Sequence, residues 1–481
     1  MFRIHAWRLL AASGLSLACC QVAVAGANAA VLAVGPATPP PASTGASPAN
    51  LPAARPVSDA VLSRAGATGQ VSTAAVSYYE QTYGVSHQVA NQRLASQLMG
   101  QGIQSTLQAK YGAGIAGVSF DNATGQWVVD ATASVPASGV AAEFARTGLS
   151  GTYHVARVGY TEGDVNGASA ELTSRLSSLI SRGVVAVTAG GGKVTVTVSD
   201  TASQTDRAEV SAAEHAVAAS SVAPPITQSS SSPGGLVAQT TTVRCSGIYC
   251  NTLVAGDAYS GNGGSCTMSW YGSLKLSGVT QPLMLTAGHC TIDTGGAGTQ
   301  VSSYDLTSNT EIGNEYLGNF SNGDWGYLYP TNPPPSGLDP GLGRPYGGYF
   351  NLGSGTLVRL NYYYSTGVPS SGTVICHNGL GSVEYLGNGT QCGTAGGTTS
   401  VNVNNDGTTT TLSNMLQVNS TEECFGDSGG PWDLASSATA VAIQSSASIP
   451  SGSNCGTTAW ATPVSTPMQA YSPWDITLYG G

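Results

Sequence analysis

Residues 424–431 read Cys-Phe-Gly-Asp-Ser-Gly-Gly-Pro, and this stretch gives the first indication of both the fold and the chemistry. A nucleophilic serine needs an exposed hydroxyl and nearby backbone N–H groups that face a developing oxyanion. Glycines on both sides of Ser428 permit the tight backbone path that such a site requires. The sequence therefore predicts Ser428 as a nucleophile, with Gly426 and Ser428 donating the two N–H groups. A plain glycine-rich turn is the alternative, since the chain holds 64 glycines.

A histidine is the next requirement, because a serine hydroxyl is not appreciably ionised near neutral pH and needs a base. From Arg244 onward the chain contains only two histidines, His289 and His377. Residues 285–290 read Leu-Thr-Ala-Gly-His-Cys, so an apolar strand ends in small residues and Cys290 can pin the loop. This context predicts His289 as the general base rather than a packing histidine at a strand end.

A carboxylate should orient the imidazole and stabilise its charged form. Asp324 is the best candidate, because residues 322–328 read Asn-Gly-Asp-Trp-Gly-Tyr-Leu and place it at the start of an apolar strand. Asp305, in the string Ser-Tyr-Asp-Leu, is the second candidate. Either choice gives the chain order His, Asp, Ser.

The N-terminus is typical of an export signal. Arg3 and Arg8 precede an apolar run, and residues 23–25 read Ala-Val-Ala, a small-residue cleavage site, so we assign residues 1–30 to a signal peptide. A lipid-anchored alternative at Cys19 or Cys20 fits less well. The other eight cysteines lie between Cys245 and Cys455, and an even number in an oxidising compartment predicts disulfides. No CxxC pair or histidine cluster accompanies them, so no metal site is predicted.

Composition divides the rest of the chain into segments. Residues 31–73 are rich in Ala and Pro and are predicted as a disordered linker. Residues 74–200 repeat a helix-then-hairpin pattern, which predicts a small α+β domain. In detail, helical spacing covers 94–111 and 172–180, and paired strand signals cover 115–131 and 184–199. Residues 201–243 are predicted as a second linker that contains the processing region.

The C-terminal segment, 244–481, has a different character. Short apolar or aromatic runs alternate with Gly, Asn, Ser and Pro clusters, which predicts an antiparallel β barrel or sandwich. With four basic and fourteen acidic residues, this segment carries the whole formal net charge of −10. Such a surface repels phosphate, so nucleic acid is excluded as a partner.

The TAGHC and GDSGGP strings, in this order, resemble the chymotrypsin superfamily of serine endopeptidases. The chain is most similar to its bacterial α-lytic protease and streptogrisin branch, as residues 253–259 (Leu-Val-Ala-Gly-Asp-Ala-Tyr) and the Cys376 to Cys392 loop show. The resemblance implies an all-β catalytic domain of two six-stranded antiparallel β barrels, with the triad at their junction. It also implies that the preceding α+β region is a pro-domain that chaperones folding and inhibits the enzyme in cis.

The resemblance further implies three disulfides, Cys266–Cys290, Cys376–Cys392 and Cys424–Cys455, and leaves Cys245 to pair with Cys250. It implies a secreted, extracellular enzyme that is monomeric, acts on protein or peptide substrates, and after processing has no contact with a membrane. No metal or organic cofactor is implied.

One position departs from the branch. An arginine usually follows the first cysteine of the loop that resembles Cys376 to Cys392, and it pairs with the aspartate before the nucleophile. Here that position is His377, so we hypothesise that His377 partners Asp427 and makes the oxyanion loop sensitive to pH. The alternative is that His377 is simply a loop residue.

Substrate specificity is the least determined feature. Glu422 and Glu423 occupy positions where the superfamily builds its primary pocket, and the strand Ser445, Ser446, Ala447 resembles the one that pairs with substrate backbone. An acidic pocket would favour Lys or Arg, whereas a solvent-facing glutamate would leave small or aromatic residues as alternatives. The rival functions are a catalytically inactive binding protein on this scaffold and an esterase, which no Gly-x-Ser-x-Gly elbow on an α/β pattern supports.

Overall fold

The computed structural model describes sixteen stretches of the chain, which lie within one compact unit, Ala53–Gly481. They are 71–219, 222–230, 255–256, 258–261, 264–276, 279–291, 302–305, 311–330, 348–351, 356–359, 362–364, 367–405, 408–435, 439–450, 452–470 and 475–478. The predicted signal peptide, almost all of the 31–73 linker and the Cys245–Cys250 pair lie outside these residues. No helix in the described stretches is long and apolar enough to cross a membrane.

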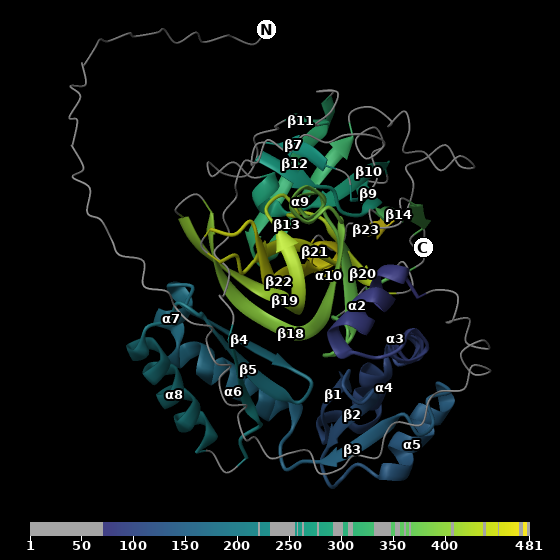
Figure 1. Cartoon of the computed structure of the whole chain (residues 1–481), viewed down its shortest axis with the longest axis vertical. Helices are drawn as coiled ribbons and strands as arrows, with labels where there is room; N and C mark the ends of the chain where they lie inside the picture. The colour runs from purple at the N-terminus through teal and green to yellow at the C-terminus, as the bar shows by residue number, and fades with distance from the viewer. Residues whose placement is uncertain are drawn as a thin grey trace, which may run out of the picture. The chain divides into compact units, whose positions relative to one another are not determined.

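The first part of the α+β region packs helices against a three-stranded sheet of order β1-β2-β3 (Figure 1). Ser72 and Ser86 cap the first two helices through their side-chain oxygens. The β1–β2 hairpin turns through Gly125, whose φ of 75° favours glycine. The elements are α2 (Thr73–Tyr83), α3 (His87–Met99), α4 (Ile103–Tyr111), η1 (Gly112–Gly114), β1 (Ile115–Asp121), β2 (Gln126–Ala131), α5 (Ala137–Arg146) and β3 (Tyr153–Arg157).

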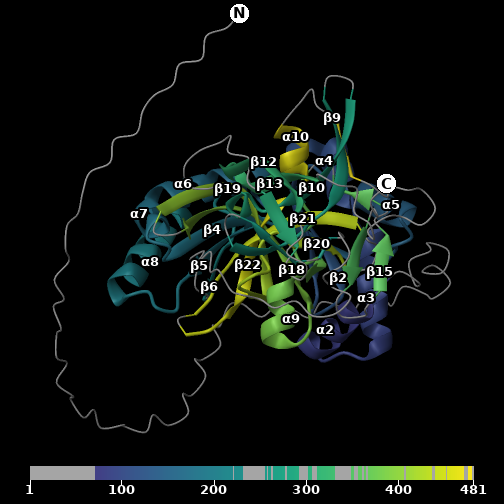
Figure 2. The same cartoon turned by 90° about the horizontal axis from the view of Figure 1, so that it is seen from above.

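The second part places helices against the β4–β5 hairpin, which pairs in parallel with β6 (Figure 2). Its core consists of aliphatic side chains such as Leu172, Val187 and Val210. The elements are α6 (Glu162–Arg175), α7 (Ser177–Ser181), β4 (Val185–Gly190), β5 (Lys193–Val198), α8 (Gln204–Ala218) and β6 (Ile226–Ser230). Helix followed by hairpin therefore occurs twice, as the sequence predicts.

The predicted helical spacing over 94–111 is confirmed and covers two helices, α3 and α4, because the chain turns at Gly100–Gly102, where Gly102 has a φ of 79°. One detail of the sequence prediction was wrong. The segment 201–243 is not linker throughout, since it contains α8 and β6. A capping box of Ser203 and Asp206 starts α8, and Val210 and Val217 bury one face, so an alanine-rich composition still forms a packed helix.

The C-terminal region is built from antiparallel strands, which confirms the all-β prediction. Its first sheet has the order β23-β9-β10-β13-β12-β11-β7-β8. The strands and short helical turn of this sheet are β7 (Ala258–Gly261), β8 (Gly264–Thr267), β9 (Tyr271–Leu276), β10 (Val279–Thr286), η3 (Gly288–Cys290), β11 (Ser302–Asp305), β12 (Glu311–Ser321), β13 (Gly323–Pro330) and β23 (Asp475–Leu478).

The second sheet closes into a barrel of six strands. Its order β17-β20-β21-β22-β19-β18 is completed by pairing of β17 with β18. Buried residues such as Ile375, Trp432 and Ala461 fill it. The elements are β14 (Gly348–Asn351), β15 (Thr356–Arg359), β16 (Tyr362–Tyr363), β17 (Val374–Asn378), α9 (Leu380–Leu386), β18 (Thr390–Asn405), β19 (Thr408–Cys424), β20 (Pro431–Leu434), β21 (Thr439–Ala447), β22 (Cys455–Pro463) and α10 (Ser465–Ala470), of which β14 and β15 form a separate pair.

The α+β region and the barrel share one sheet, because β4 pairs with β18 in antiparallel register (Figure 1). The approach is close at Gly397, where an added Cβ would lie 2.3 Å from the carbonyl oxygen of Ala189. Glycine at this position therefore allows the two strands to pair.

In the described part of the β region, three disulfides tie the strands together: Cys266–Cys290, Cys376–Cys392 and Cys424–Cys455. The first joins β8 to the turn η3, the second joins β17 to β18, and the third joins the ends of β19 and β22. Each holds a segment next to the candidate site described below.

Candidate active site

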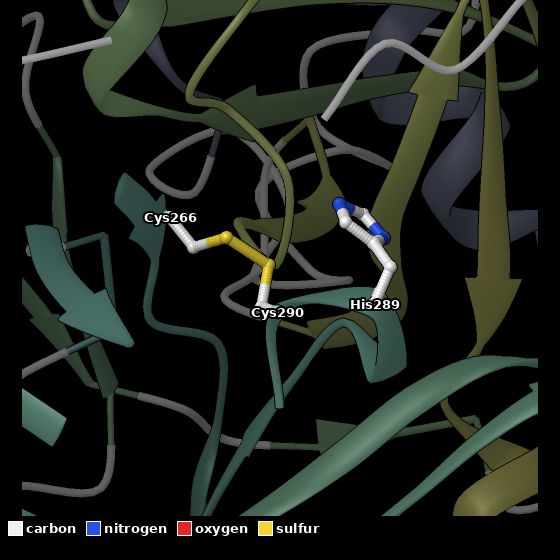
Figure 3. Close-up of side chains that lie close together, drawn as sticks. All are labelled: Cys266, His289 and Cys290. Carbon is white, nitrogen blue, oxygen red and sulfur yellow. A yellow bond between two sulfur atoms is a disulfide. The ribbon is translucent and has the colours of Figure 1, made fainter. Parts of the chain in front are cut away.

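His289 lies on η3, the short turn that follows β10, beside the Cys266–Cys290 disulfide (Figure 3). Its backbone N–H donates to Oδ1 of Asp324 at 2.9 Å, and its Nδ1 lies 2.6 Å from Oδ2 of the same carboxylate. Both side chains are buried. The carboxylate therefore fixes the main chain and the ring of His289 together, and it selects the tautomer that carries a proton on Nδ1.

Asp324 is held at the start of β13 by residues of the six-stranded barrel. Its backbone N–H donates to Oγ1 of Thr462 at 2.7 Å, and the Thr462 hydroxyl donates to its carbonyl oxygen at 2.9 Å. The hydroxyl of Ser445 donates to Oδ2 at 2.7 Å. The aspartate is fully buried, and its carboxylate accepts from the Ser445 hydroxyl and from His289, while Thr462 holds its main chain.

Ser428 is attached to the same hydrogen-bond network through Ser445. Its hydroxyl donates to the carbonyl oxygen of Ser445 at 3.2 Å, and its own carbonyl oxygen accepts from the N–H of Thr267 at 2.8 Å. The three predicted residues thus lie in one cluster: Ser428 contacts Ser445, Ser445 contacts Asp324, and Asp324 contacts His289.

The loop around Ser428 contains two glycines with positive φ. Gly426 has a φ of 99° and Gly429 a φ of 90°, both in the region that favours glycine. The carbonyl oxygen of Gly426 is held by the Thr267 hydroxyl at 2.7 Å. Among the described residues, nothing accepts a hydrogen bond from the N–H groups of Gly426 and Ser428, so both can donate to a bound oxygen.

A strand that could pair with substrate backbone runs past the nucleophile. Ser445, Ser446 and Ala447 end β21 and are buried, with an irregularity in the pairing to β22 between Gln444 and Ser446. The two glutamates before Cys424 differ sharply: Glu422 is exposed, whereas Glu423 is fully buried.

The histidine that departs from the branch pattern faces Glu423, not the carboxylate of Asp427. His377 Nδ1 lies 3.1 Å from Glu423 Oε2, off the line of a well-aligned hydrogen bond, and the ring packs on Trp432 with centroids 5.1 Å apart. Burial lowers the pKa of His377 to about 3. Burial and the nearby charge of Asp427 raise the pKa of Glu423 well above its usual value.

Among the residues that the structure describes, two groups of side chains have the composition of a metal site, and neither fits one. In the first, Cys266, Cys290 and His289, both sulfurs are used in a disulfide. In the second, His377, Glu423 and Asp427, the aspartate oxygens already accept three hydrogen bonds. We assign no metal to either group.

Several contributors to this site were not predicted from the sequence. Thr267, Thr462 and Ser382 support the reactive groups through hydroxyl bonds, yet no local motif marks any of the three. The substrate-strand prediction named Ser445 but missed its bond to Asp324. Asp305, the second candidate acid, ends β11, and its side chain lies outside the described residues.

No protein-family model and no curated protein matches the chain. Solved structures do. A glutamic acid specific serine protease matches at 22% identity and a TM-score of 0.35, covering 47% of this chain and 100% of its own. A chymotrypsin from Cellulomonas bogoriensis matches at 22% identity and a TM-score of 0.34, and the match covers 48% of this chain and 100% of the chymotrypsin. A Nocardiopsis protease matches at 22% identity and a TM-score of 0.33, and the match covers 47% of this chain and 98% of the protease.

The chain is similar to bacterial chymotrypsin-like serine proteases.

Proposed function

We propose that the chain is the precursor of a secreted serine endopeptidase. The observation that carries the proposal is the continuous network His289–Asp324–Ser445–Ser428, in which base, acid and nucleophile come from three different strands or turns. Beside it, the N–H groups of Gly426 and Ser428 have no acceptor among the described residues, so both can donate to an oxyanion.

The mechanism follows from these positions. The Ser428 hydroxyl leaves its bond to Ser445 and turns toward Nε2 of His289, which takes the proton as Oγ attacks the peptide carbonyl carbon. The N–H groups of Gly426 and Ser428 stabilise the oxyanion, and Asp324 stabilises the imidazolium. The imidazolium then protonates the leaving amine as the C–N bond breaks. Water repeats the sequence and releases the acid, so the proposed reaction needs no cofactor.

The test is covalent labelling of the processed protein with a serine-directed fluorophosphonate, followed by peptide mapping. The expected result is one label on Ser428, hydrolysis of casein, and loss of both in Ser428→Ala and His289→Ala. An unlabelled, folded and inert protein would favour the second candidate, a catalytically inactive binding protein on the same scaffold.

We further propose that residues 74–200 and the elements that follow act as a pro-domain in cis. Contacts between this region and the barrel support the proposal. Beyond the β4–β18 pairing, the side chain of Gln97 accepts from the N–H of Val374 at 2.8 Å, and Asn122 donates to the carbonyl oxygen of Gly372 at 2.7 Å. The helices α2 and α3 also cover apolar side chains beside the Cys376–Cys392 disulfide.

Such contacts suit a folding template. The strands of the barrel pair across long sequence separations, which makes the search for the native topology slow. A preformed α+β domain that offers β4 to β18 and captures the start of β17 would reduce that search. The proposed mature enzyme is extracellular and monomeric, and its partners are protein or peptide substrates rather than nucleic acid or a membrane.

A preference for Lys or Arg would rest on Glu422. Its neighbour Glu423 faces His377 inside the protein and cannot reach a substrate side chain without leaving that contact. A peptide library cut by the wild type and by Glu422→Gln tests the preference. Basic cleavage sites that persist unchanged in the variant would contradict a role for Glu422.

A further inference from the structure

Asp427, the residue before the nucleophile, carries a carboxylate that is fully buried. A buried charge is costly unless it is paired or accepts several hydrogen bonds. A cation or a set of hydrogen-bond donors beside Asp427 can offset this cost.

The nearby titratable groups supply no cation. From β17, His377 is neutral near neutral pH, because burial lowers its pKa to about 3. From β19, Glu423 is an acid whose pKa is raised, so it adds no positive charge. On α9 the only acidic residue, Glu384, is exposed.

Hydrogen bonds replace the cation, and Ser382 supplies two of them. The N–H of Ser382 donates to Oδ1 of Asp427 at 2.8 Å, and its hydroxyl donates to Oδ2 at 2.6 Å. The N–H of Cys424 adds a third bond to Oδ2 at 2.8 Å. Ser382 is itself fully buried on α9, 45 residues away in the sequence.

The start of α9 fits closely against the nucleophile loop. A Cβ at Gly379 would lie 2.1 Å from Oδ1 of Asp427, and one at Gly381 would lie 2.1 Å from the carbonyl oxygen of Phe425. Glycine at both positions lets the backbone approach so that Ser382 reaches the carboxylate.

The loop itself transmits the position of Asp427 to the reactive groups. Its N–H donates to the carbonyl oxygen of Cys424 at 3.1 Å, and its carbonyl oxygen accepts from Gly430 at 2.9 Å. Asp427 lies between Gly426 and Ser428, whose N–H groups are the proposed oxyanion donors. A displaced carboxylate would therefore tilt both donors.

We propose that Ser382 is a positioning residue that holds Asp427, and through it the oxyanion loop and Ser428, in the place of a cation. This proposal rests on the proposed function, since its effect is read in the rate of peptide hydrolysis. It assigns to α9 the task of fixing the loop by neutral donors alone.

The test compares Ser382→Ala and Ser382→Thr with the wild type. The full precursor is expressed, and rates are normalised to active sites titrated with the fluorophosphonate, so that only folded enzyme is counted. We expect Ser382→Ala to lower kcat roughly ten- to a hundred-fold with little change in KM. Ser382→Thr keeps the hydroxyl and should retain activity within about three-fold of the wild type.

The pH profile separates positioning from general destabilisation. The Ser382 bonds lower the pKa of Asp427, which burial raises to about 6. Their removal should raise that pKa further, so the acid limb of kcat should move to higher pH in Ser382→Ala and stay in place in Ser382→Thr. The matched control is Ser453→Ala, which loses an exposed hydroxyl that donates to the carbonyl oxygen of Cys455 at 2.8 Å. This variant should leave kcat and its acid limb unchanged.

The outcomes are distinguishable. A wild type that is neither labelled nor active contradicts the proposed function. An active wild type with kcat and acid limb unaltered in Ser382→Ala overturns the positioning role. If Ser382→Ala yields no titratable enzyme, Ser382→Thr decides the question. A more than ten-fold loss of kcat in Ser382→Thr, with an unmoved acid limb, also overturns the positioning role.

Discussion

At the scale of single residues, the site depends on uncharged hydroxyl groups that orient its carboxylates. Oδ2 of Asp324 accepts both from Nδ1 of His289 at 2.6 Å and from the Ser445 hydroxyl at 2.7 Å. A carboxylate with two fixed donors on one oxygen has one preferred orientation, so the imidazole has one as well.

Replacement of Ser445 by alanine should therefore impair catalysis more than binding. The loss of a hydrogen bond to a charged group is expected to cost about 1.5–3 kcal/mol, or roughly ten- to a hundred-fold in kcat. Steady-state kinetics on a peptide substrate measure this. Ser448→Ala removes a buried hydroxyl three residues further along the chain and should have a much smaller effect. Equal losses in the two variants would contradict the assigned role.

Burial of His377 should make the free energy of unfolding depend on pH. Its folded pKa, about 3, lies below the value of about 6.5 for an unfolded histidine, so between these values the unfolded state binds the extra proton. The neutral ring thus favours folding fully above pH 6.5, and this contribution is lost as pH falls toward 3.

His377→Gln should accordingly weaken the fall in thermal unfolding temperature between pH 6.5 and 4. The measurement is a melting curve at each pH for the full chain in a Ser428→Ala background, which prevents self-cleavage. His87→Gln, at a histidine with an exposed side chain, is the control. A melting temperature that falls as steeply in His377→Gln as in the parent would refute the prediction.

At the scale of elements, short segments between strands carry the reactive groups, and covalent bonds hold them. The turn η3 spans only Gly288–Cys290, and the Cys266–Cys290 disulfide links it to β8 across 24 residues (Figure 3). Gly288 contacts the neighbouring strands closely, since an added Cβ would lie 2.1 Å from the carbonyl oxygen of Asn319. The position of His289 is thus fixed from both sides.

Loss of this disulfide should destabilise the β region and disturb the base. For Cys266→Ser with Cys290→Ser, we expect a loss of roughly 3 kcal/mol in the free energy of unfolding, from the loop-closure entropy of a loop of this size. Denaturant titration of the full chain in the Ser428→Ala background measures it. Cys424→Ser with Cys455→Ser, which opens a loop of similar length, provides the comparison. No change in the denaturation midpoint would contradict the expectation.

At the scale of the whole molecule, the α+β region contacts the barrel in two ways. Strand β4 pairs with β18, and polar side chains bond to the main chain of the barrel. Asn122 is the central residue of these polar contacts. Its side-chain amide donates to the carbonyl oxygen of Gly372 and accepts from Gln97, both at 2.7 Å. Its main-chain carbonyl oxygen accepts from the Tyr79 hydroxyl at 3.0 Å. Because Gln97 also binds the N–H of Val374, two side chains recognise the backbone that leads into β17.

Asn122→Ala in the full precursor should reduce the yield of active enzyme about ten-fold, while the rate per titrated active site stays unchanged, because the mature barrel is not altered. Refolding from denaturant, followed by active-site titration, gives both numbers. Asn91→Ala is the matched control, since its amide only bonds within α3. An undiminished yield in Asn122→Ala would argue against this contact as part of a folding template.

Much of this architecture could be predicted from the sequence, because its signals are local. The strings around His289 and Ser428 identify the reactive residues by their immediate neighbours, and alternation with turn residues identifies the β class. The helix-and-hairpin pattern of the α+β region is likewise a matter of periodicity. The exception was α8, where an alanine-rich helix resembled linker until its packing against β4 and β5 was visible.

Only the tertiary structure decided how the site is held together. Ser445 reaches Asp324 across 121 positions, Thr462 reaches it across 138, and Ser382 reaches Asp427 across 45. The chain is rich in serine and threonine, and a hydroxyl forms no pattern that marks its distant partner. The same reason explains why His377 faces Glu423 and not the carboxylate of Asp427: local sequence sets which residues can react, and packing sets which groups hold them in place.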